Sequence, residues 1–332
     1  MVLESGSPAG PGRLIPREIP EPVPGPGEIR LKVLACGVCR TDLHLVSGDL
    51  EPGKPDLVPG HQAVGRVDAV GPGAEGFRVG DTAGATWLYL TCGRCIYCVT
   101  GRENLCDRIR FTGMHADGGY AEAMVIPATH AVPLPEGLSA PDTAPLLCAG
   151  VIGYRSLKLS GVLPGQILGL FGFGASAHIT LQIALRMGCR ICVFSRDDAH
   201  RRHALSLGAA WAGRLEDNPP EPLHGAITFA PSGRVAVEAL RKLRKGGTVA
   251  VNAVHMDTLP AFPYSSLYQE RCIRSVANIT REDIREFMAL AAAGPFRVKI
   301  NPFPLAEANI ALARMLASDF QGAAVLLIPG AA

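Results

Sequence analysis

The chain has 332 residues, of which 48% are hydrophobic and 19% are charged, and its formal net charge is +2. This length allows two domains with separate cores, and the composition excludes an intrinsically disordered chain. The near-neutral charge argues against a nucleic-acid-binding or anionic-membrane protein, and no apolar run approaches the roughly 20 residues that span a bilayer.

The N-terminal stretch MVLESGSPAGPGRLIPREIP lacks the charged-then-apolar order of a signal peptide. Ten cysteines in a chain without an export signal favour reduced thiols and metal ligation. We therefore expect a cytoplasmic protein.

The first part of the chain is predicted to form a small, irregular domain rich in β-strands. Alternation of apolar and polar residues begins at residues 28–33, and residues 63–71 have a similar strand-like pattern. Gly and Pro recur between such segments, which is typical of short strands joined by tight turns.

Four cysteines then follow one another closely, with the spacing Cys-x2-Cys-x2-Cys-x7-Cys. Four thiolates this near to each other can surround one tetrahedral zinc ion, with each sulfur at about 2.3 Å. Disulfides and unrelated buried thiols are the alternatives, although cysteines three residues apart close a strained ring. The segment from about residue 88 to 110 is predicted to be a structural zinc lobe without an open position for chemistry. Its ligands are Cys92, Cys95, Cys98 and Cys106.

From about residue 139 the pattern changes to alternating helices and strands. Such alternation predicts a parallel sheet that is covered on both faces. From about residue 294 the pattern is irregular again, and residues 301–328 end in a helix and a strand. The expected elements between these limits are a helix within 141–159, helices at 177–188 and 197–208, and strands at 166–171, 190–194, 226–230, 248–251 and 274–277.

The segment GFGASA lies between an expected strand and an expected helix, which favours a dinucleotide site. Gly172 permits a tight turn, and Gly174 and Ala175 bring backbone close to a pyrophosphate at the helix N-terminus. Ala177 stands where a third glycine is more usual, and the pattern tolerates alanine there. A plain tight turn is the alternative.

The end of the next strand bears on the type of nicotinamide cofactor. An Asp or Glu there usually binds a free ribose 2′-hydroxyl, but this chain has Ser195 and Arg196 and no carboxylate before Asp197. Serine and arginine suit a 2′-phosphate, so NADP(H) is favoured and NAD(H) remains possible. Arg196 could instead be a solvated residue, or stack on adenine in an enzyme that uses NAD(H).

Five motifs in order, GVCRTDLH, PGHQAVGRV, the four-cysteine lobe, PLLCAG and GFGASA, resemble the zinc-dependent alcohol dehydrogenases of the medium-chain dehydrogenase/reductase superfamily. The resemblance covers essentially the whole chain. It implies an α/β fold in which residues 1–150 and 290–332 form a GroES-like β-rich catalytic domain. Residues 151–289 would form a Rossmann domain, with a doubly wound parallel sheet that binds NAD(P).

Carried over by position, the resemblance implies a second, catalytic zinc held by Cys39, His61 and Cys148. Two thiolates, one imidazole and an open position are a known catalytic zinc set. Thr41 matches the residue that hydrogen-bonds the substrate oxygen, and His44 matches the residue that passes the proton to solvent. Without the motif, Cys148 could be a buried apolar thiol and His44 a surface histidine.

Three neighbouring residues also match family positions. Asp42 resembles the carboxylate that orients the zinc-bound histidine. Arg40 resembles a contact to the cofactor pyrophosphate, although without the motif it could equally be a surface charge. Gln62 departs from the family, which usually has Glu after the histidine. We expect the missing charge to make the field at zinc more positive, and so to lower the pKa of a bound alcohol or to slow ligand exchange.

The predicted protein is therefore a two-domain enzyme with two zinc ions per chain, which transfers hydride reversibly between an alcohol and NAD(P). Its substrate would be a small alcohol, aldehyde or ketone, with no nucleic-acid or membrane partner, and the family implies a homodimer or homotetramer. The alternatives are a polyol dehydrogenase, a predominantly aldehyde-reducing enzyme, or a non-catalytic NAD(P)-binding zinc protein that senses redox state. The residues considered for the substrate pocket, each of which could equally be core, are Trp87, Leu88, Phe111 and Met114.

Overall fold

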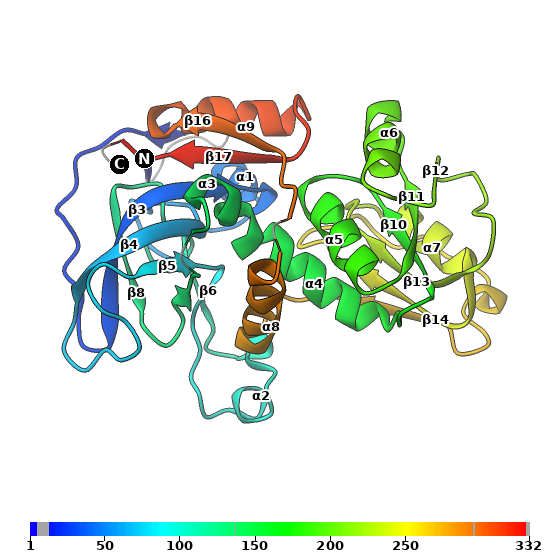
Figure 1. The fold of residues 1–332 in the computed structure, drawn as a ribbon, viewed down its shortest axis with the longest axis horizontal. Coiled ribbons are helices and arrows are strands. Elements are labelled where there is room, and N and C mark those ends of the chain that lie inside the picture. Colours follow the sequence, from blue (N-terminus) through cyan, green and yellow to red (C-terminus); the bar gives the residue numbers. More distant parts are fainter. Residues whose placement is uncertain (5–12, 136, 295, 330–332) are drawn as a thin grey trace. The chain divides into compact units, whose positions relative to one another are not determined.

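The computed structural model describes residues 1–4, 13–135, 137–294 and 296–329, and it divides the chain into two compact units. One unit contains residues 1–148 and 278–332, and the other contains residues 149–277. Each unit has its own central sheet (Figure 1). Within the described ranges, no helix combines the length and the apolar character needed to cross a membrane.

A seven-stranded sheet forms the centre of the first unit. Its longest strand, β3 (Glu28–Val38), pairs antiparallel with three others. β3 confirms the strand predicted at its start, and its last four residues are all buried, so it runs from a half-solvated face into the core. The other strands of this sheet are β4 (Gln62–Val70), β5 (Thr82–Ala85), β8 (Ala123–Pro127), β9 (Val132–Pro133), β16 (Ile300–Pro304) and β17 (Ala323–Leu327).

Short elements surround this sheet. β1 (Val2–Leu3) and β2 (Leu14–Ile15) form a small antiparallel pair. The remaining elements of the unit, several of them labelled in Figure 1, are α1 (Arg40–Ser47), β6 (Leu88–Leu90), α2 (Ile96–Val99), η1 (Glu103–Leu105), β7 (Arg110–Phe111), α3 (Ala140–Thr143), η2 (Ala144–Leu147), α8 (Arg281–Ala292), η4 (Leu305–Glu307) and α9 (Ala308–Leu316).

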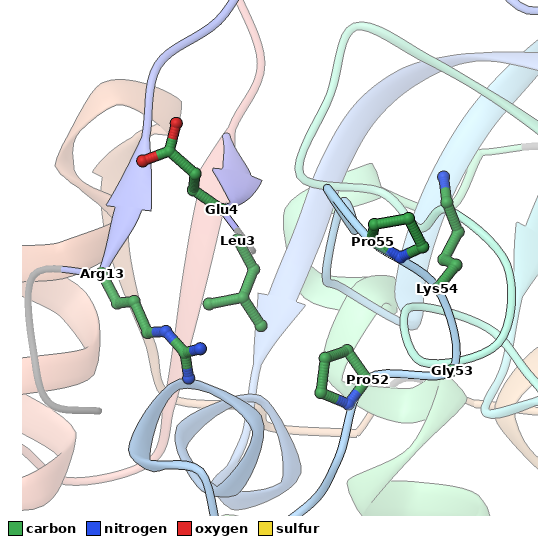
Figure 2. A pocket seen from close by; sticks show the side chains of 7 residues that line it. All are labelled: Leu3, Glu4, Arg13, Pro52, Gly53, Lys54 and Pro55. Atoms are coloured by element: carbon green, nitrogen blue, oxygen red, sulfur yellow. The ribbon is translucent and has the colours of Figure 1, made fainter. Parts of the chain in front are cut away.

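An open pocket of about 410 Å³ lies beside the β1–β2 pair (Figure 2). Its lining contains none of the residues that the sequence singled out. The lining residues are Leu3, Glu4, Arg13, Pro52, Gly53, Lys54 and Pro55.

The second unit contains a six-stranded sheet in which every pair of neighbouring strands is parallel. The strand order, β12-β11-β10-β13-β14-β15, corresponds to the 3-2-1-4-5-6 order of a Rossmann fold when β10 is counted first. The doubly wound α/β prediction is therefore confirmed. The strands are β10 (Ile167–Phe171), β11 (Arg190–Phe194), β12 (Trp211–Gly213), β13 (Leu223–Thr228), β14 (Leu243–Val251) and β15 (Cys272–Ser275), and the helices are α4 (Ala149–Ser160), α5 (Ala175–Arg186), α6 (Asp198–Ser206), α7 (Gly233–Arg241) and η3 (Tyr264–Ser266).

The helix expected within residues 141–159 is confirmed from Ala149 onward, but not before it. The chain forms α3, then the 3-10 turn η2, and regular helix begins only at Ala149. Pro141 lies in the first turn of α3, where proline is tolerated, but Pro145 has no N–H to continue that helix and its ring would clash with the preceding turn. Cys148 lies at the break with φ −131° and ψ −69°, outside helical geometry. The Cys148 side chain therefore leaves the backbone from a non-helical residue, and its direction is not fixed by the geometry of α4.

Candidate active site

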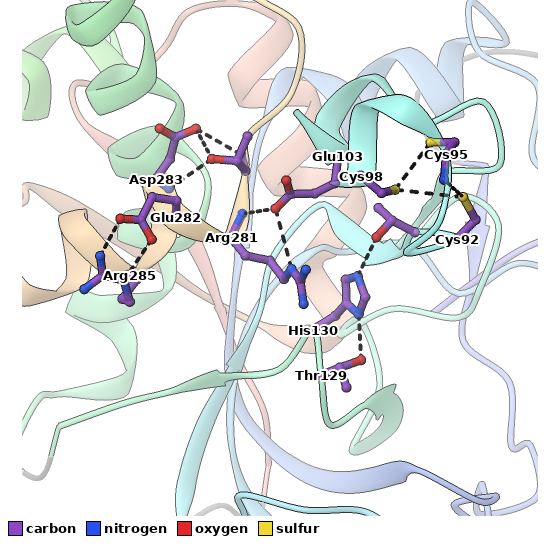
Figure 3. A network of polar contacts seen from close by, with 12 residues as sticks. Cys92, Cys95, Cys98, Glu103, Thr129, His130, Arg281, Glu282, Asp283 and Arg285 are labelled. Carbon is purple, nitrogen blue, oxygen red and sulfur yellow. Dashed lines mark hydrogen bonds and ion pairs between the residues drawn. The ribbon is translucent and has the colours of Figure 1, made fainter. Parts of the chain in front are cut away.

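Four thiols converge in the loop between β6 and β7, and Figure 3 shows three of them, Cys92, Cys95 and Cys98. The sulfurs of Cys92, Cys95, Cys98 and Cys106 all lie within 4.8 Å of one another, and none forms a disulfide. Backbone N–H groups of the turn donate to the sulfurs, for example from Cys95 to Cys92 at 3.4 Å, and they lower the pKa of Cys92 to about 6. This donor set fits a tetrahedral zinc ion, with sulfur in all four positions.

Buried polar contacts join this loop to the start of α8. The Glu103 carboxylate, whose side chain is 6% exposed, accepts a hydrogen bond from the Arg281 backbone N–H at 2.8 Å. The Asn278 side chain donates to the Asn104 carbonyl at 3.3 Å. Figure 3 shows Glu103 and Arg281 beside the cysteines.

His130 is the buried histidine of this network. Its Nε2 lies 3.3 Å from the Thr91 hydroxyl, and its Nδ1 lies 2.9 Å from the Thr129 hydroxyl. Burial lowers the pKa of His130 to about 4, and the nearby Arg281 charge acts in the same direction. His130 is therefore neutral at pH 7.

A second cluster contains Cys39, His61 and Cys148, whose ligand atoms also lie within 4.8 Å of one another. The three residues come from different places: Cys39 caps α1, His61 directly precedes β4, and Cys148 lies at the break before α4. His61 Nε2 is 3.4 Å from Cys39 Sγ, so this nitrogen faces the sulfurs. The structure thus brings together the three residues that the resemblance identified.

Cys39 and His61 shift each other's pKa in this cluster. A hydrogen bond from Cys148, together with the neighbouring imidazole, lowers the pKa of Cys39 well below its usual value. Burial alone would lower the pKa of His61, but Cys39 and Asp42 outweigh it and raise that pKa to about 10. Without a metal, Cys39 is thus favoured as a thiolate and His61 as a protonated imidazole. A zinc ion would bind that thiolate and displace the imidazole proton, because zinc takes thiolate and neutral imidazole donors.

Asp42 supports the cluster from inside the protein. Its Oδ2 accepts the Cys39 backbone N–H at 2.9 Å, which completes a capping box at the start of α1. Its Oδ1 lies 3.4 Å from His61 Nδ1, the ring nitrogen that faces away from the sulfurs. A carboxylate in this place fixes the tautomer and orientation of a metal-binding imidazole.

Thr41 and His44 lie three residues apart on α1, next to Cys39. The Thr41 backbone N–H donates to Cys39 Sγ at 3.3 Å. His44 Nδ1 lies 2.8 Å from the Asp49 carboxylate, and the His44 side chain is 23% exposed. The sequence did not point to Asp49, because it lies beyond the end of the helix with no motif around it.

The other two residues near Cys39 differ in burial. Arg40 is exposed at the start of α1. Gln62 is 2% exposed, and its Nε2 has no hydrogen-bond partner among the described residues. A polar group in such a place can still bind a ligand or water.

An aromatic row adjoins His61. The Trp87 ring meets the His61 ring edge-on at 4.8 Å and stacks on Phe111 at 4.7 Å, and His115 follows Phe111 at 5.5 Å. Leu88, in contrast, is 1% exposed. The sequence did not predict that His115 would lie beside Phe111, because their contact depends on the turn after β7.

The dinucleotide motif lies at the start of α5 as expected. Gly172 follows β10 with φ +92°, a conformation that favours glycine, and Gly174 is the N-cap of α5. A Cβ on Gly174 would meet nothing within 4 Å, and Ala175 begins the helix behind it. Ala177 is fully buried. Open space before uncapped helical N–H groups fits a pyrophosphate.

The turn after β11 holds Ser195 and Arg196. The Ser195 hydroxyl accepts the Asp197 N–H at 3.3 Å and lies 3.5 Å from His200 Nδ1, whereas Arg196 is exposed. Arg201 donates to the backbone carbonyl of Ser195 at 2.6 Å and to that of Arg196 at 3.0 Å. His200 and Arg201 belong to the next helix, α6, and no sequence motif pointed to them.

Comparison with known proteins agrees with this geometry. The model of the alcohol dehydrogenase GroES-like domain matches residues 25–136. The chain is 49% identical over 313 residues to a probable alcohol dehydrogenase, AdhA, of Mycobacterium tuberculosis, covering 92% of this chain and 90% of the relative. It is 35% identical to an alcohol dehydrogenase of Geobacillus stearothermophilus, covering 93% and 94%. A cinnamyl alcohol dehydrogenase from Sorghum bicolor superposes with a TM-score of 0.89 at 27% identity, covering 98% and 97%.

Proposed function

The chain belongs to the zinc-type alcohol dehydrogenases of the medium-chain dehydrogenase/reductase superfamily, and we propose that Cys39, His61 and Cys148 hold its catalytic zinc. The protein is an NAD(P)-dependent oxidoreductase that acts on an alcohol or aldehyde. The observation that carries the assignment is the convergence of two thiols and one imidazole beside Thr41. The four-cysteine cluster is assigned a structural role because sulfur fills all its positions.

When bound, zinc supplies Lewis acidity towards an alcohol oxygen, and the nicotinamide supplies the acceptor or donor of hydride. In the proposed mechanism the Thr41 hydroxyl accepts a hydrogen bond from the substrate hydroxyl. It takes up the substrate proton as it passes its own proton on towards His44. Asp49, 2.8 Å from His44 Nδ1, orients that imidazole. Asp42 holds the His61 ring in place from the opposite side.

NADP(H) is the preferred cofactor in this proposal. Asp197, the first carboxylate after β11, accepts the Ala199 N–H at 2.6 Å as the N-cap of α6, so it serves the helix. Arg196 is an exposed cation at the same turn, suited to a 2′-phosphate beside Ser195. Arg40 is proposed as a contact to the pyrophosphate.

The substrate is proposed to be an apolar primary or secondary alcohol, or the matching aldehyde or ketone. The stacked Trp87 and Phe111 rings beside His61 supply an apolar surface next to the proposed catalytic zinc. Gln62 is proposed to leave the field at zinc more positive than the Glu that is usual in the family.

We assign catalysis to the unit that contains the Cys39 cluster and cofactor binding to the unit with the parallel sheet. A cytoplasmic location is proposed because both clusters need reduced thiols. A homodimer or homotetramer is proposed from the family resemblance alone.

The test is zinc content together with turnover of benzyl alcohol and benzaldehyde with each cofactor. The parent protein should bind two zinc ions per chain and turn over faster with NADP(H). Cys148→Ala should bind one zinc and lose turnover by about 10³-fold, the scale of several kcal/mol that Lewis-acid catalysis supplies.

Cys192→Ala is the matched control, because Cys192 is a buried thiol in β11 of the other unit. It should keep both metals and turnover. One zinc in the parent, or two zincs in Cys148→Ala, would exclude the proposed catalytic site. Faster turnover with NAD(H) would overturn the cofactor preference alone.

A further inference from the structure

Arg201 is an arginine of α6 whose side chain folds back onto the turn that follows β11. Its guanidinium donates to the carbonyl of Ser195 at 2.6 Å and to that of Arg196 at 3.0 Å. It also forms an ion pair with Asp198, and only 14% of its side chain is exposed. Arg201 is thus a cation held among oxygens of its own chain, whereas Arg196 is exposed.

The contacts of Arg201 fix the direction in which the peptide groups of this turn face. In a trans peptide the C=O and the N–H point in opposite directions, and the described residues contain no cis peptide bond. Because both carbonyls point at Arg201, the N–H groups of Arg196 and Asp197 point to the other side of the turn. The Asp197 N–H donates there to the Ser195 hydroxyl at 3.3 Å. The Ser195 hydroxyl and the Arg196 N–H therefore share the side of the turn that faces away from Arg201.

This turn adjoins the glycine motif of the dinucleotide site. The Gly172 N–H donates to the Phe194 carbonyl at 2.8 Å, so the end of β11 is bonded to the segment that leads into α5. On the next strand, the Gly213 carbonyl accepts the Ser195 N–H at 3.0 Å. A dinucleotide whose pyrophosphate lies at the start of α5 places its adenosine ribose at the end of the second strand. The 2′ substituent of that ribose therefore faces the turn that Arg201 holds.

We propose that Arg201 is a positioning residue for the 2′-phosphate of NADP(H), and that it holds the turn so that the Ser195 hydroxyl and the N–H and side chain of Arg196 form one anion site. Arg201 acts through the turn and does not contact the phosphate, because its two terminal nitrogens are engaged by the two carbonyls and by Asp198. This inference rests on the proposed preference for NADP(H).

A turn that is held in advance matters because a backbone N–H and a short serine side chain cannot reach out to a ligand. Ordering flexible residues when a ligand binds reduces affinity, and a turn that is already ordered avoids this cost. The long, exposed Arg196 side chain attracts a phosphate but does not by itself fix its position. Losing the two bonds from Arg201 should weaken phosphate binding by about 10-fold, the equivalent of one ordinary hydrogen bond.

The experiment compares Arg201→Met with Arg202→Met in the full-length, zinc-loaded protein. Both changes remove one cation from α6, but Arg202 is exposed, and the described residues show no bond from it to the turn. The probes are adenosine 2′,5′-bisphosphate and adenosine 5′-monophosphate, which differ only in the 2′-phosphate. Titration calorimetry gives the dissociation constant of each. Their ratio reports phosphate binding and is not moved by a general loss of stability.

In Arg201→Met the bisphosphate should bind about 10-fold more weakly, while the monophosphate binds as in the parent. Arg202→Met should leave the ratio close to that of the parent, because salt screens an exposed cation. Arg201→Lys keeps the charge but loses the planar fork, so it should recover part of the loss. In turnover, Arg201→Met should raise the KM for NADP(H) and leave kcat and the KM for NAD(H) unchanged.

Equal ratios in Arg201→Met and Arg202→Met would overturn the inference, as would the same loss of affinity for both nucleotides in Arg201→Met. If the parent protein binds the bisphosphate no more tightly than the monophosphate, the preference for NADP(H) fails and the inference fails with it. The first failure is seen only in the variants and the second in the parent, so the two are distinguished.

Discussion

The two thiol clusters of the first unit are built in opposite ways. The four-cysteine cluster lies within residues 92–106, and the turn's own backbone N–H groups bind its sulfurs. The cluster of Cys39, His61 and Cys148 draws on three distant positions and depends on buried side chains around it. In the four-cysteine cluster, the spacing of the ligands along the chain largely determines their geometry. In the cluster of Cys39, His61 and Cys148, the ligand geometry depends on the packing of the residues around it.

We expect the largest difference between the two clusters in how much each contributes to the free energy of unfolding. Cys95→Ala should lower the free energy of unfolding by about 3 kcal/mol or more, because metal binding in a small loop is also its folding energy. Cys148→Ala should lower it less, because the strands and helices around that site have a large apolar core. Differential scanning calorimetry of the two zinc-loaded variants measures this, and equal losses would contradict the contrast.

The next largest expected effect is on the rate of proton transfer beside the cluster of Cys39, His61 and Cys148. His44→Gln should lower kcat by about 10²-fold, since a positioned acid-base group contributes at least that much. Asp49→Asn should have a smaller effect, because the imidazole remains and only its orienting partner changes. Steady-state kinetics at pH 7 measures both.

The control is His224→Gln, which changes a histidine at the start of β13 in the other unit. Its kcat should match that of the parent. An unchanged kcat in His44→Gln would remove His44 from the proposed relay.

The smallest expected effect is the acid sensitivity that buried His130, beside the four-cysteine loop, gives to the folded protein. The pKa of buried His130 is about 4 in the folded protein, against an ordinary value of 6.5, so the unfolded chain binds a proton that the folded chain excludes between these values. Stability due to this group is complete above pH 6.5 and falls as the pH is lowered towards 4. Between pH 7 and pH 5 the loss should be about 2 kcal/mol.

His130→Gln removes this titration and keeps a polar side chain near the Thr91 and Thr129 hydroxyls. Urea unfolding at pH 7 and pH 5 should therefore show a smaller acid-induced loss in the variant. Buried His178 of the other unit also has its pKa lowered to about 4, so some acid sensitivity remains in both proteins. Identical losses in parent and variant would contradict the prediction.

The difference between the locally built cluster and the cluster of distant residues also explains which features could be predicted from the sequence. The four-cysteine spacing and the alternation of strands and helices are local patterns, and the structure confirms the fold they predicted. The Cys39, His61 and Cys148 set was identified only through the family resemblance, because no local pattern links residues so far apart. Asp49 was missed for a related reason: it reaches His44 only through the turn that follows α1.

Two secondary-structure findings show the limits of periodicity. The apolar pattern through residues 141–159 suggested one helix, but Pro145 interrupts it and regular helix begins only at Ala149. Helix α8 was not anticipated, although Thr280 and Asp283 form a capping box, a signal that the sequence contains. In both cases the turn chemistry was more informative than the hydrophobic pattern.

The close approach of Gly118 and Gly119 to Gly60 means that His61 follows a segment packed against residues that are synthesised after the four-cysteine loop. A Cβ on Gly118 would lie 1.9 Å from the Gly60 carbonyl oxygen, so only glycine permits this backbone crossing. The four-cysteine loop can take up its metal once residue 106 has left the ribosome. The catalytic cluster must wait for residues 118–120 and for Cys148, so each new chain is expected to acquire its structural ion before its catalytic one.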